Sequence, residues 1–130
     1  VGTDIIRESW IKNMLRKKKL IIRLFNQQEI LNCKKKVNFL NCFAKRFAAK
    51  EAFSKALGTG IANGIQFNEI IVLNEKNGKP FIKLINKTKT IVERKLRNKK
   101  YKISLSLSDE KMYAVAFVTI SIWKIIKLKT

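Results

Sequence analysis

The sequence contains no histidine, and this absence narrows the chemistry available to the protein. Without an imidazole, His-based acid–base catalysis, Ser-His-Asp arrangements and nearly all zinc sites are excluded. Cysteine is also scarce, because Cys33 and Cys42 are the only two and lie too far apart for a C-x-x-C site. Any catalysis must therefore use carboxylates, lysines or a hard cation held by oxygen ligands.

Long hydrophobic runs and a leading signal segment are absent as well. No apolar stretch approaches the roughly 20 residues that a membrane-spanning helix needs, and the first residues lack the basic-then-apolar pattern of a signal peptide. We therefore expect no transmembrane segment, a cytoplasmic location and reduced, partly buried thiols at Cys33 and Cys42. Because the chain begins at Val1 rather than methionine, we also expect the start of its first strand to be missing.

Acidic residues are few, since 9 Asp and Glu stand against 29 Lys and Arg, which gives a net charge of +20. A charge of this size attracts polyanions, so nucleic acid, an anionic membrane surface and an acidic protein are all candidate partners. An alternative stays open, because an AT-rich coding sequence enriches lysine, isoleucine and asparagine without any partner. A hydrophobic fraction of 46% over 130 residues still indicates one compact globular domain.

The spacing of apolar residues predicts an α+β fold with a small antiparallel sheet packed by helices. Helical spacing covers residues 7–25, 37–57 and 87–98, and Asn26 with Glu29 has the pattern of a capping box that opens a short helix. Strands are predicted over residues 1–6, 67–73, 81–85, 103–107 and 112–122. We expect a single domain over residues 1–122, followed by a lysine-rich tail over residues 123–130.

The most informative stretch runs from Arg46 to Ile61 and reads Arg-Phe-Ala-Ala-Lys-Glu-Ala-Phe-Ser-Lys-Ala-Leu-Gly-Thr-Gly-Ile. Each of its features has an ordinary explanation, since Glu51 with Lys55 is a common helix-surface ion pair and glycine commonly ends a helix. Asp4, far upstream, is equally plausible as a helix N-cap. In combination, however, two converging carboxylates can hold Mg²⁺, while a lysine and a glycine turn contact phosphate oxygens.

Gly2-Thr3-Asp4-Ile5, followed by that stretch, resembles the signature of the bacterial holo-acyl-carrier-protein synthases. The similarity continues in order through residues 23–29, 77–80, 106–110 and 113–114, and leaves only the tail unmatched. It implies a 4′-phosphopantetheinyl transferase of fatty acid biosynthesis, which moves 4′-phosphopantetheine from coenzyme A to a serine of apo acyl carrier protein and releases 3′,5′-ADP. The resemblance further implies a homotrimer, with each active site in a cleft between neighbouring subunits.

The resemblance also implies roles for individual residues. Asp4 and Glu51 match the family's Mg²⁺ ligands, and Lys55 matches the lysine beside the coenzyme A pyrophosphate, so these three are the expected catalytic residues. The matches to the coenzyme-binding surface are Arg46, Ser54, Gly58, Thr59 and Gly60, and those to the adenine-side loop are Lys79 and Pro80.

The basic residues of the predicted first helix are candidates for docking the acidic carrier protein. They are Arg16, Lys17, Lys18, Lys19 and Arg23, although a solvated lysine face explains them too. Three positions depart from the family pattern. Ser104 stands in place of a frequent histidine, Trp10 in place of an arginine, and Arg7 in place of an acidic residue. These departures concern coenzyme and carrier contacts more than the metal site.

Two other classes of function remain as alternatives. A basic nucleic-acid-binding domain agrees with the charge, but the sequence has no zinc finger, RNP-type aromatic motif or recognisable helix-turn-helix, so we expect only sequence-independent binding. A peripheral membrane protein is the other. Neither explains why Lys50, Glu51 and Lys55 precede a glycine turn. A related transferase for other carrier domains is also possible, although the short chain disfavours the larger two-lobed type.

Overall fold

The computed structural model describes residues 1–58 and 64–123, so Thr59, Gly60 and almost all of the predicted tail lie outside the described residues. In chain order the elements are β1 Gly2–Arg7, α1 Glu8–Met14, α2 Lys18–Leu24, α3 Gln27–Lys34, α4 Phe39–Leu57, the 3₁₀ turn η1 Phe67–Glu69, β2 Ile70–Asn74, β3 Pro80–Leu84, α5 Asn86–Lys95, β4 Lys100–Glu110 and β5 Tyr113–Trp123. This composition confirms the predicted α+β class.

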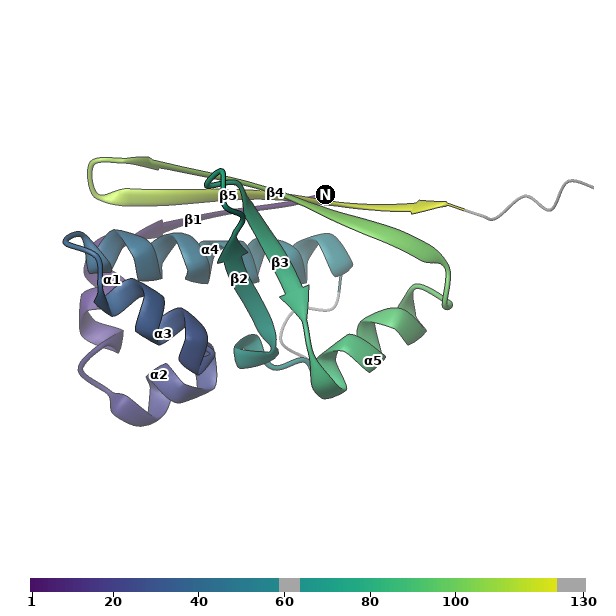
Figure 1. Cartoon of the computed structure of the whole chain (residues 1–130), viewed down its shortest axis with the longest axis horizontal. Coiled ribbons are helices and arrows are strands. Elements are labelled where there is room, and N and C mark those ends of the chain that lie inside the picture. The colour runs from purple at the N-terminus through teal and green to yellow at the C-terminus, as the bar shows by residue number, and fades with distance from the viewer. Residues whose placement is uncertain (59–63, 124–130) are drawn as a thin grey trace, which may run out of the picture.

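The strands form two antiparallel sheets rather than the single small sheet predicted. One sheet has the order β1-β5-β4, and the other is the hairpin of β2 and β3. Figure 1 shows α4 running beneath the long β4–β5 hairpin, with α1, α2 and α3 gathered below the N-terminal half of α4. The β2–β3 hairpin crosses α4 instead of extending the larger sheet.

The helix α4 forms the centre of the core because small and large side chains occupy different sides of it. Its alanines, including Ala48 and Ala52, are buried and allow β1 and β5 to approach closely. Gly2 is required there, since an added Cβ would lie 2.0 Å from the carbonyl oxygen of Ala52. Phe43 and Phe47 pack against aromatic rings at the other sides of the helix, with centroid distances of 5.0 Å and 6.0 Å.

The helix predicted over residues 7–25 is broken into α1 and α2. Lys17 has extended backbone angles, with φ −105° and ψ 95°, where the second helix begins. Like charges three or four residues apart, such as Lys12 with Arg16 and Arg16 with Lys19, destabilise a continuous helix. Apolar spacing did not reveal the break because side chains on both helices pack against the core. The capping box of Asn26 and Glu29 at the start of α3 is confirmed.

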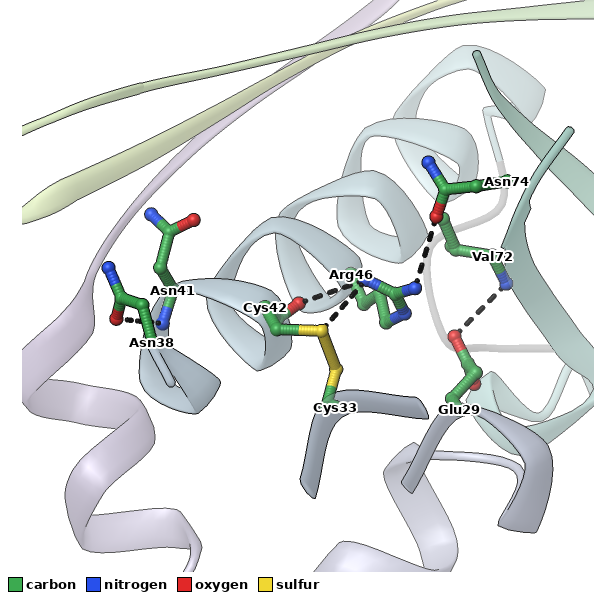
Figure 2. The surroundings of a disulfide bond; sticks show 8 residues. All are labelled: Glu29, Cys33, Asn38, Asn41, Cys42, Arg46, Val72 and Asn74. Carbon is green, nitrogen blue, oxygen red and sulfur yellow. Dashed lines mark hydrogen bonds between the residues drawn. A yellow bond between two sulfur atoms is a disulfide. The ribbon is translucent and has the colours of Figure 1, made fainter. Parts of the chain in front are cut away.

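The expectation of two reduced thiols is wrong, because Cys33 and Cys42 form a disulfide (Figure 2). Cys33 lies on α3 and Cys42 on α4, and the short connection between the helices brings their Cα atoms to 5.4 Å. That distance lies within the usual range for a disulfide. The sequence spacing gave no indication of this pairing, because it depends on how the two helices pack.

No helix in the described part of the chain is long and apolar enough to cross a membrane.

Candidate functional site

Asp4 in β1 and Glu51 and Lys55 on α4 form the first candidate site, called here the Asp4 cluster. The close packing of β1 on α4 brings the strand carboxylate to the helix, so that Lys55 Nζ donates to Asp4 Oδ1 at 2.9 Å. The same Nζ donates to the carbonyl oxygen of Thr3 at 3.1 Å. Asp4 therefore lies within the strand and is not the N-cap of α1, a position held by Arg7.

The electrostatics of the Asp4 cluster favour a bound cation. Burial raises the pKa of Glu51, repulsion by Asp4 raises it further, and Lys55 opposes both effects. Two carboxylates that repel each other form a hard oxygen donor set, which suits Mg²⁺ because this ion takes few protein ligands and completes its shell with water and phosphate oxygens. Among the described residues no group of three or more His, Cys, Asp or Glu side chains gathers.

Arg46 lies in a second site, called here the Arg46 pocket, which has a volume of about 320 Å³. Its guanidinium is held by Cys42, which accepts from Nη1 at the carbonyl oxygen (3.4 Å) and at Sγ (3.1 Å), and by Asn74 Oδ1, which accepts from Nη2 at 3.3 Å (Figure 2). Nε is buried and has no hydrogen-bond partner within residues 1–58 and 64–123. The lining residues are Lys36, Asn38, Asn41, Cys42, Lys45, Arg46, Asn74, Gly78, Pro80 and Leu107.

The Arg46 pocket is basic. Three cationic side chains line it and, among the described residues, no carboxylate does, although Lys45 Nζ lies 3.6 Å from Asp109 Oδ1. Burial lowers the pKa of the Arg46 guanidinium, while attraction by Glu29 opposes the shift. A pocket with cationic walls and a buried, partly unpaired guanidinium suits a phosphate-bearing ligand, because arginine matches phosphate oxygens in geometry and charge.

The two candidate sites lie on opposite sides of α4. An α-helix turns about 100° and rises about 1.5 Å per residue. Over the nine positions from Arg46 to Lys55 it makes about two and a half turns, so these two side chains point in opposite directions and lie about 13 Å apart along the helix axis. Gly58 ends the helix with φ 84° on the side of Lys55. Ser54 is buried and its Oγ has no hydrogen-bond partner among the described residues.

The adenine-side residues predicted from the sequence are only partly assembled. Pro80 begins β3 and lines the Arg46 pocket, which brings it together with Arg46. Lys79 is exposed in the β2–β3 turn and is not among the lining residues. The turn is held by Asn77, whose Oδ1 accepts from the Lys79 backbone N–H at 3.0 Å.

The predicted docking residues extend from the turn after α1 along α2. Arg16 and Lys17 lie in the turn after α1, and the others lie on α2 itself. Beside them is an apolar groove of about 630 Å³, which sequence reasoning missed because its walls come from three helices and the turn after α1. Its lining residues are Leu15, Lys18, Ile21, Ile22, Ile30, Lys34, Phe39 and Phe43.

Glu29 and Lys50 form a fully buried ion pair that sequence reasoning also missed. Lys50 Nζ donates to Glu29 Oε1 at 2.7 Å, to the Phe67 carbonyl oxygen at 2.7 Å and to the Ile70 carbonyl oxygen. Glu29 Oε2 accepts from the Val72 backbone N–H at 3.0 Å. The pair thus joins α3, α4, η1 and β2. Burial lowers the pKa of Lys50 to about 8, although Glu29 opposes the shift.

Comparison with known proteins places this chain and its fold in one family. A model of the 4′-phosphopantetheinyl transferase superfamily matches residues 1–118. A holo-[acyl-carrier-protein] synthase from Pelagibacter ubique is 43% identical, over 91% of this chain and 92% of its own.

Solved structures agree with that assignment. The holo-[acyl-carrier-protein] synthase of Neisseria meningitidis superposes with a TM-score of 0.80 at 32% identity, covering 92% of this chain and 95% of the other. The Helicobacter pylori enzyme, in complex with coenzyme A, gives a TM-score of 0.76 at 30% identity, with coverages of 92% and 98%. The resemblance seen in the sequence is thereby confirmed, and the chain belongs to the 4′-phosphopantetheinyl transferase superfamily.

Proposed function

We propose that this chain is a holo-acyl-carrier-protein synthase, which transfers 4′-phosphopantetheine from coenzyme A to apo acyl carrier protein in the cytoplasm, for fatty acid biosynthesis. The observation that carries the proposal is the Asp4 cluster. It unites two carboxylates and a lysine at 2.9 Å from one of them, in a chain similar to a protein solved with coenzyme A. Neither nucleic acid nor a membrane surface, the two alternative partners, explains why Asp4, Glu51 and Lys55 converge.

The residues of the Asp4 cluster fit a Mg²⁺ ion, because the mutual repulsion of Asp4 and Glu51 is relieved when a cation lies between them. Asp4 and Glu51 would hold the metal. When bound, Mg²⁺ supplies Lewis-acid stabilisation of charge on the pyrophosphate oxygens of coenzyme A. Lys55 would bind a phosphate oxygen, since its side chain is 55% exposed.

The reaction that follows is attack by the carrier serine hydroxyl on the β-phosphorus of coenzyme A. The new P–O bond joins phosphopantetheine to the serine, the pyrophosphate P–O bond breaks, and 3′,5′-ADP leaves. Lys55 stabilises the negative charge that develops on the phosphate oxygens, which is the main catalytic lever in this type of transfer. The serine proton passes to water or to Glu51.

A complete coenzyme site needs two subunits. The Asp4 cluster and the Arg46 pocket lie on opposite sides of α4, so one subunit supplies the metal side and its neighbour supplies the nucleotide side. A homotrimer provides three such clefts, because a head-to-tail interface closes into a ring. The sheet face turned away from α4 supports association, since it exposes Ile5, Val115 and Phe117 at 63%, 36% and 43%.

The carrier protein is proposed to dock at the start of α2. Arg16, Lys17, Lys18, Lys19 and Arg23 form a basic rim, and the apolar groove beside them suits the apolar face of an acidic helix. The acidic partner and the basic rim attract each other, while the groove removes apolar surface from water.

Intact-mass spectrometry of an apo acyl carrier protein tests the proposed reaction. Incubation with this protein, coenzyme A and Mg²⁺ should add one phosphopantetheine group to the carrier, and EDTA should prevent the addition. A known active synthase, acting on the same carrier, serves as the control. If that control modifies the carrier and this protein does not, the proposed function is wrong for that carrier.

A further inference from the structure

The disulfide between Cys33 and Cys42 forms part of the wall of the Arg46 pocket. Cys42 is both a disulfide partner and a lining residue, and its Sγ accepts a hydrogen bond from Arg46 Nη1 at 3.1 Å (Figure 2). The second arm of the guanidinium is fixed by Asn74 on β2. A change in the redox state of this pair therefore changes a group that the Arg46 guanidinium contacts directly.

The disulfide is also one of the restraints on one side of the pocket. Residues 34–39, which include the connection between α3 and α4, are all exposed, and Val37 has no burial at all. Lys36 and Asn38 from this connection nevertheless line the pocket. The connection is held by the N-cap of α4, where Asn38 Oδ1 accepts from the Asn41 backbone N–H, and by a backbone hydrogen bond from Lys36 N–H to the Cys33 carbonyl oxygen at 3.0 Å. The disulfide adds a covalent link between the two helices that flank it.

We propose that this disulfide is a redox-sensitive lock, which in its oxidised form shapes the Arg46 pocket to bind the phosphate-bearing nucleotide part of coenzyme A and in its reduced form weakens that binding. The inference rests on the proposed function. Reduction requires a dithiol reductant, which donates two electrons and two protons. The S–S bond breaks, two S–H groups form, and the reductant leaves as its own disulfide.

Reduction weakens the pocket in two ways. The connection carrying Lys36 loses its covalent restraint, so binding must order it more than in the oxidised form. In addition, the neutral sulfur beside Arg46 becomes a thiol, and an adjacent guanidinium favours the thiolate form. A thiolate at Cys42 would neutralise the positive charge that attracts phosphate. A mainly reducing compartment makes this transition accessible, because protein disulfides do not persist there without protection.

The coupling must act in both directions. If oxidation strengthens ligand binding by some factor, the bound ligand shifts the thiol–disulfide equilibrium towards the disulfide by the same factor. The ligand also covers Cys42, which is 3% exposed and faces the pocket. An occupied pocket should thus protect the disulfide from reductant.

Titration calorimetry with 3′,5′-ADP tests the lock, because this nucleotide lacks the thiol through which coenzyme A would itself attack a disulfide. Oxidised protein and protein reduced with dithiothreitol are compared after alkylation and mass measurement have established their thiol content. We expect Kd to increase roughly tenfold on reduction, from the loss of a preorganised wall. The variants Cys33→Ser, Cys42→Ser and the double variant should show the weak Kd with and without reductant.

Equal Kd for oxidised and reduced wild-type protein overturns the lock. If the protein modifies its carrier normally in that case, the proposed function stands alone. If oxidised protein shows no affinity for 3′,5′-ADP and leaves the carrier unmodified, both proposals fail. Circular dichroism verifies that each variant is folded. Should a cysteine variant not fold, the rate of wild-type reduction decides, since 3′,5′-ADP should slow it and an unchanged rate contradicts the lock.

Discussion

Among individual side chains, Glu51 is the one on which the proposed chemistry depends most. Glu51→Gln keeps the size of the side chain and removes its charge, so the Asp4 cluster loses one of its two carboxylates. We expect turnover to fall by at least about 100-fold. We also expect added Mg²⁺ to raise the Tm of the wild-type protein and not that of the variant, because only the former gains stability by binding the ion.

Glu110→Gln is the matched control, since Glu110 is exposed at the turn between β4 and β5 and should leave both properties unchanged. Calorimetric melting and the carrier mass assay measure the two effects. A Glu51→Gln variant that turns over at a near-normal rate would remove this carboxylate from the catalytic site.

Lys50 makes the stability of the protein depend on pH. Its pKa is lowered from 10.5 to about 8 by burial, so between these values the unfolded chain holds more protons than the folded chain. The free energy of unfolding should therefore rise with pH across that window, by up to about 1.4 kcal/mol per pH unit. Below about pH 8 Lys50 is protonated in both states and adds no pH dependence.

A double variant, Glu29→Gln with Lys50→Met, isolates this effect because it removes both charges of the buried pair. Urea unfolding of the wild-type protein and of the variant is compared at steps across the window. The free energy of unfolding of the wild-type protein should rise with pH relative to that of the variant. A constant difference would mean that Lys50 does not titrate there.

For individual side chains, the sequence predicted contacts between residues of the same motif. Glu51 and Lys55 are four residues apart on one helix, and the family resemblance supplied Asp4. The Glu29–Lys50 contact was not predictable, since its partners are 21 residues apart on two helices. The capping box already explained Glu29, and only the packing of α3 on α4 shows that the same carboxylate also binds a buried lysine.

Among the elements, α2 carries the proposed docking surface for the carrier protein. If the basic rim steers an acidic partner, kcat/KM for apo acyl carrier protein should fall steeply as salt is added, while kcat changes little. Lys18→Glu together with Arg23→Glu should lower kcat/KM by roughly tenfold or more at low salt and leave the KM for coenzyme A unchanged.

Lys89→Glu on α5 is the control for that pair of substitutions, because it changes an exposed charge on a different helix. Initial rates at varied carrier concentration and ionic strength provide the measurement. Salt-independent kcat/KM would show that the basic rim is a solvated face without a docking role.

Prediction of the elements succeeded where local patterns decide and failed where packing decides. The central helix was predicted because phenylalanines at regular spacing and a terminal glycine mark it. The break between α1 and α2 was missed, since Ile11 and Ile21 both pack against the core and their periodicity continues across it. The two separate sheets were missed for a related reason, because hydrophobic alternation does not say which strands pair.

For the whole molecule, the arrangement around α4 determines how the site is assembled. The Asp4 cluster and the Arg46 pocket lie on opposite sides of α4, and the outer sheet face exposes apolar side chains. The proposed ring of three subunits would explain both observations together. The opposite directions follow from the spacing of Arg46 and Lys55 once the helix is predicted. The exposed sheet face does not, because it depends on how β1 and β5 pair and on which of their faces α4 covers.

Mixing two inactive variants tests this assembly. Glu51→Gln damages the metal side and Arg46→Gln damages the nucleotide side, so each homotrimer should have little activity. In randomly mixed trimers, a cleft is intact only when an Arg46→Gln subunit supplies the metal side and a Glu51→Gln subunit supplies the nucleotide side. At equal amounts this holds for about a quarter of the clefts, so the co-refolded mixture should recover about a quarter of the wild-type rate.

Sedimentation must show a trimer for both variants. A mixture whose rate equals the average of the two separate variants would place each complete site within one subunit, and monomers in solution would contradict the ring itself.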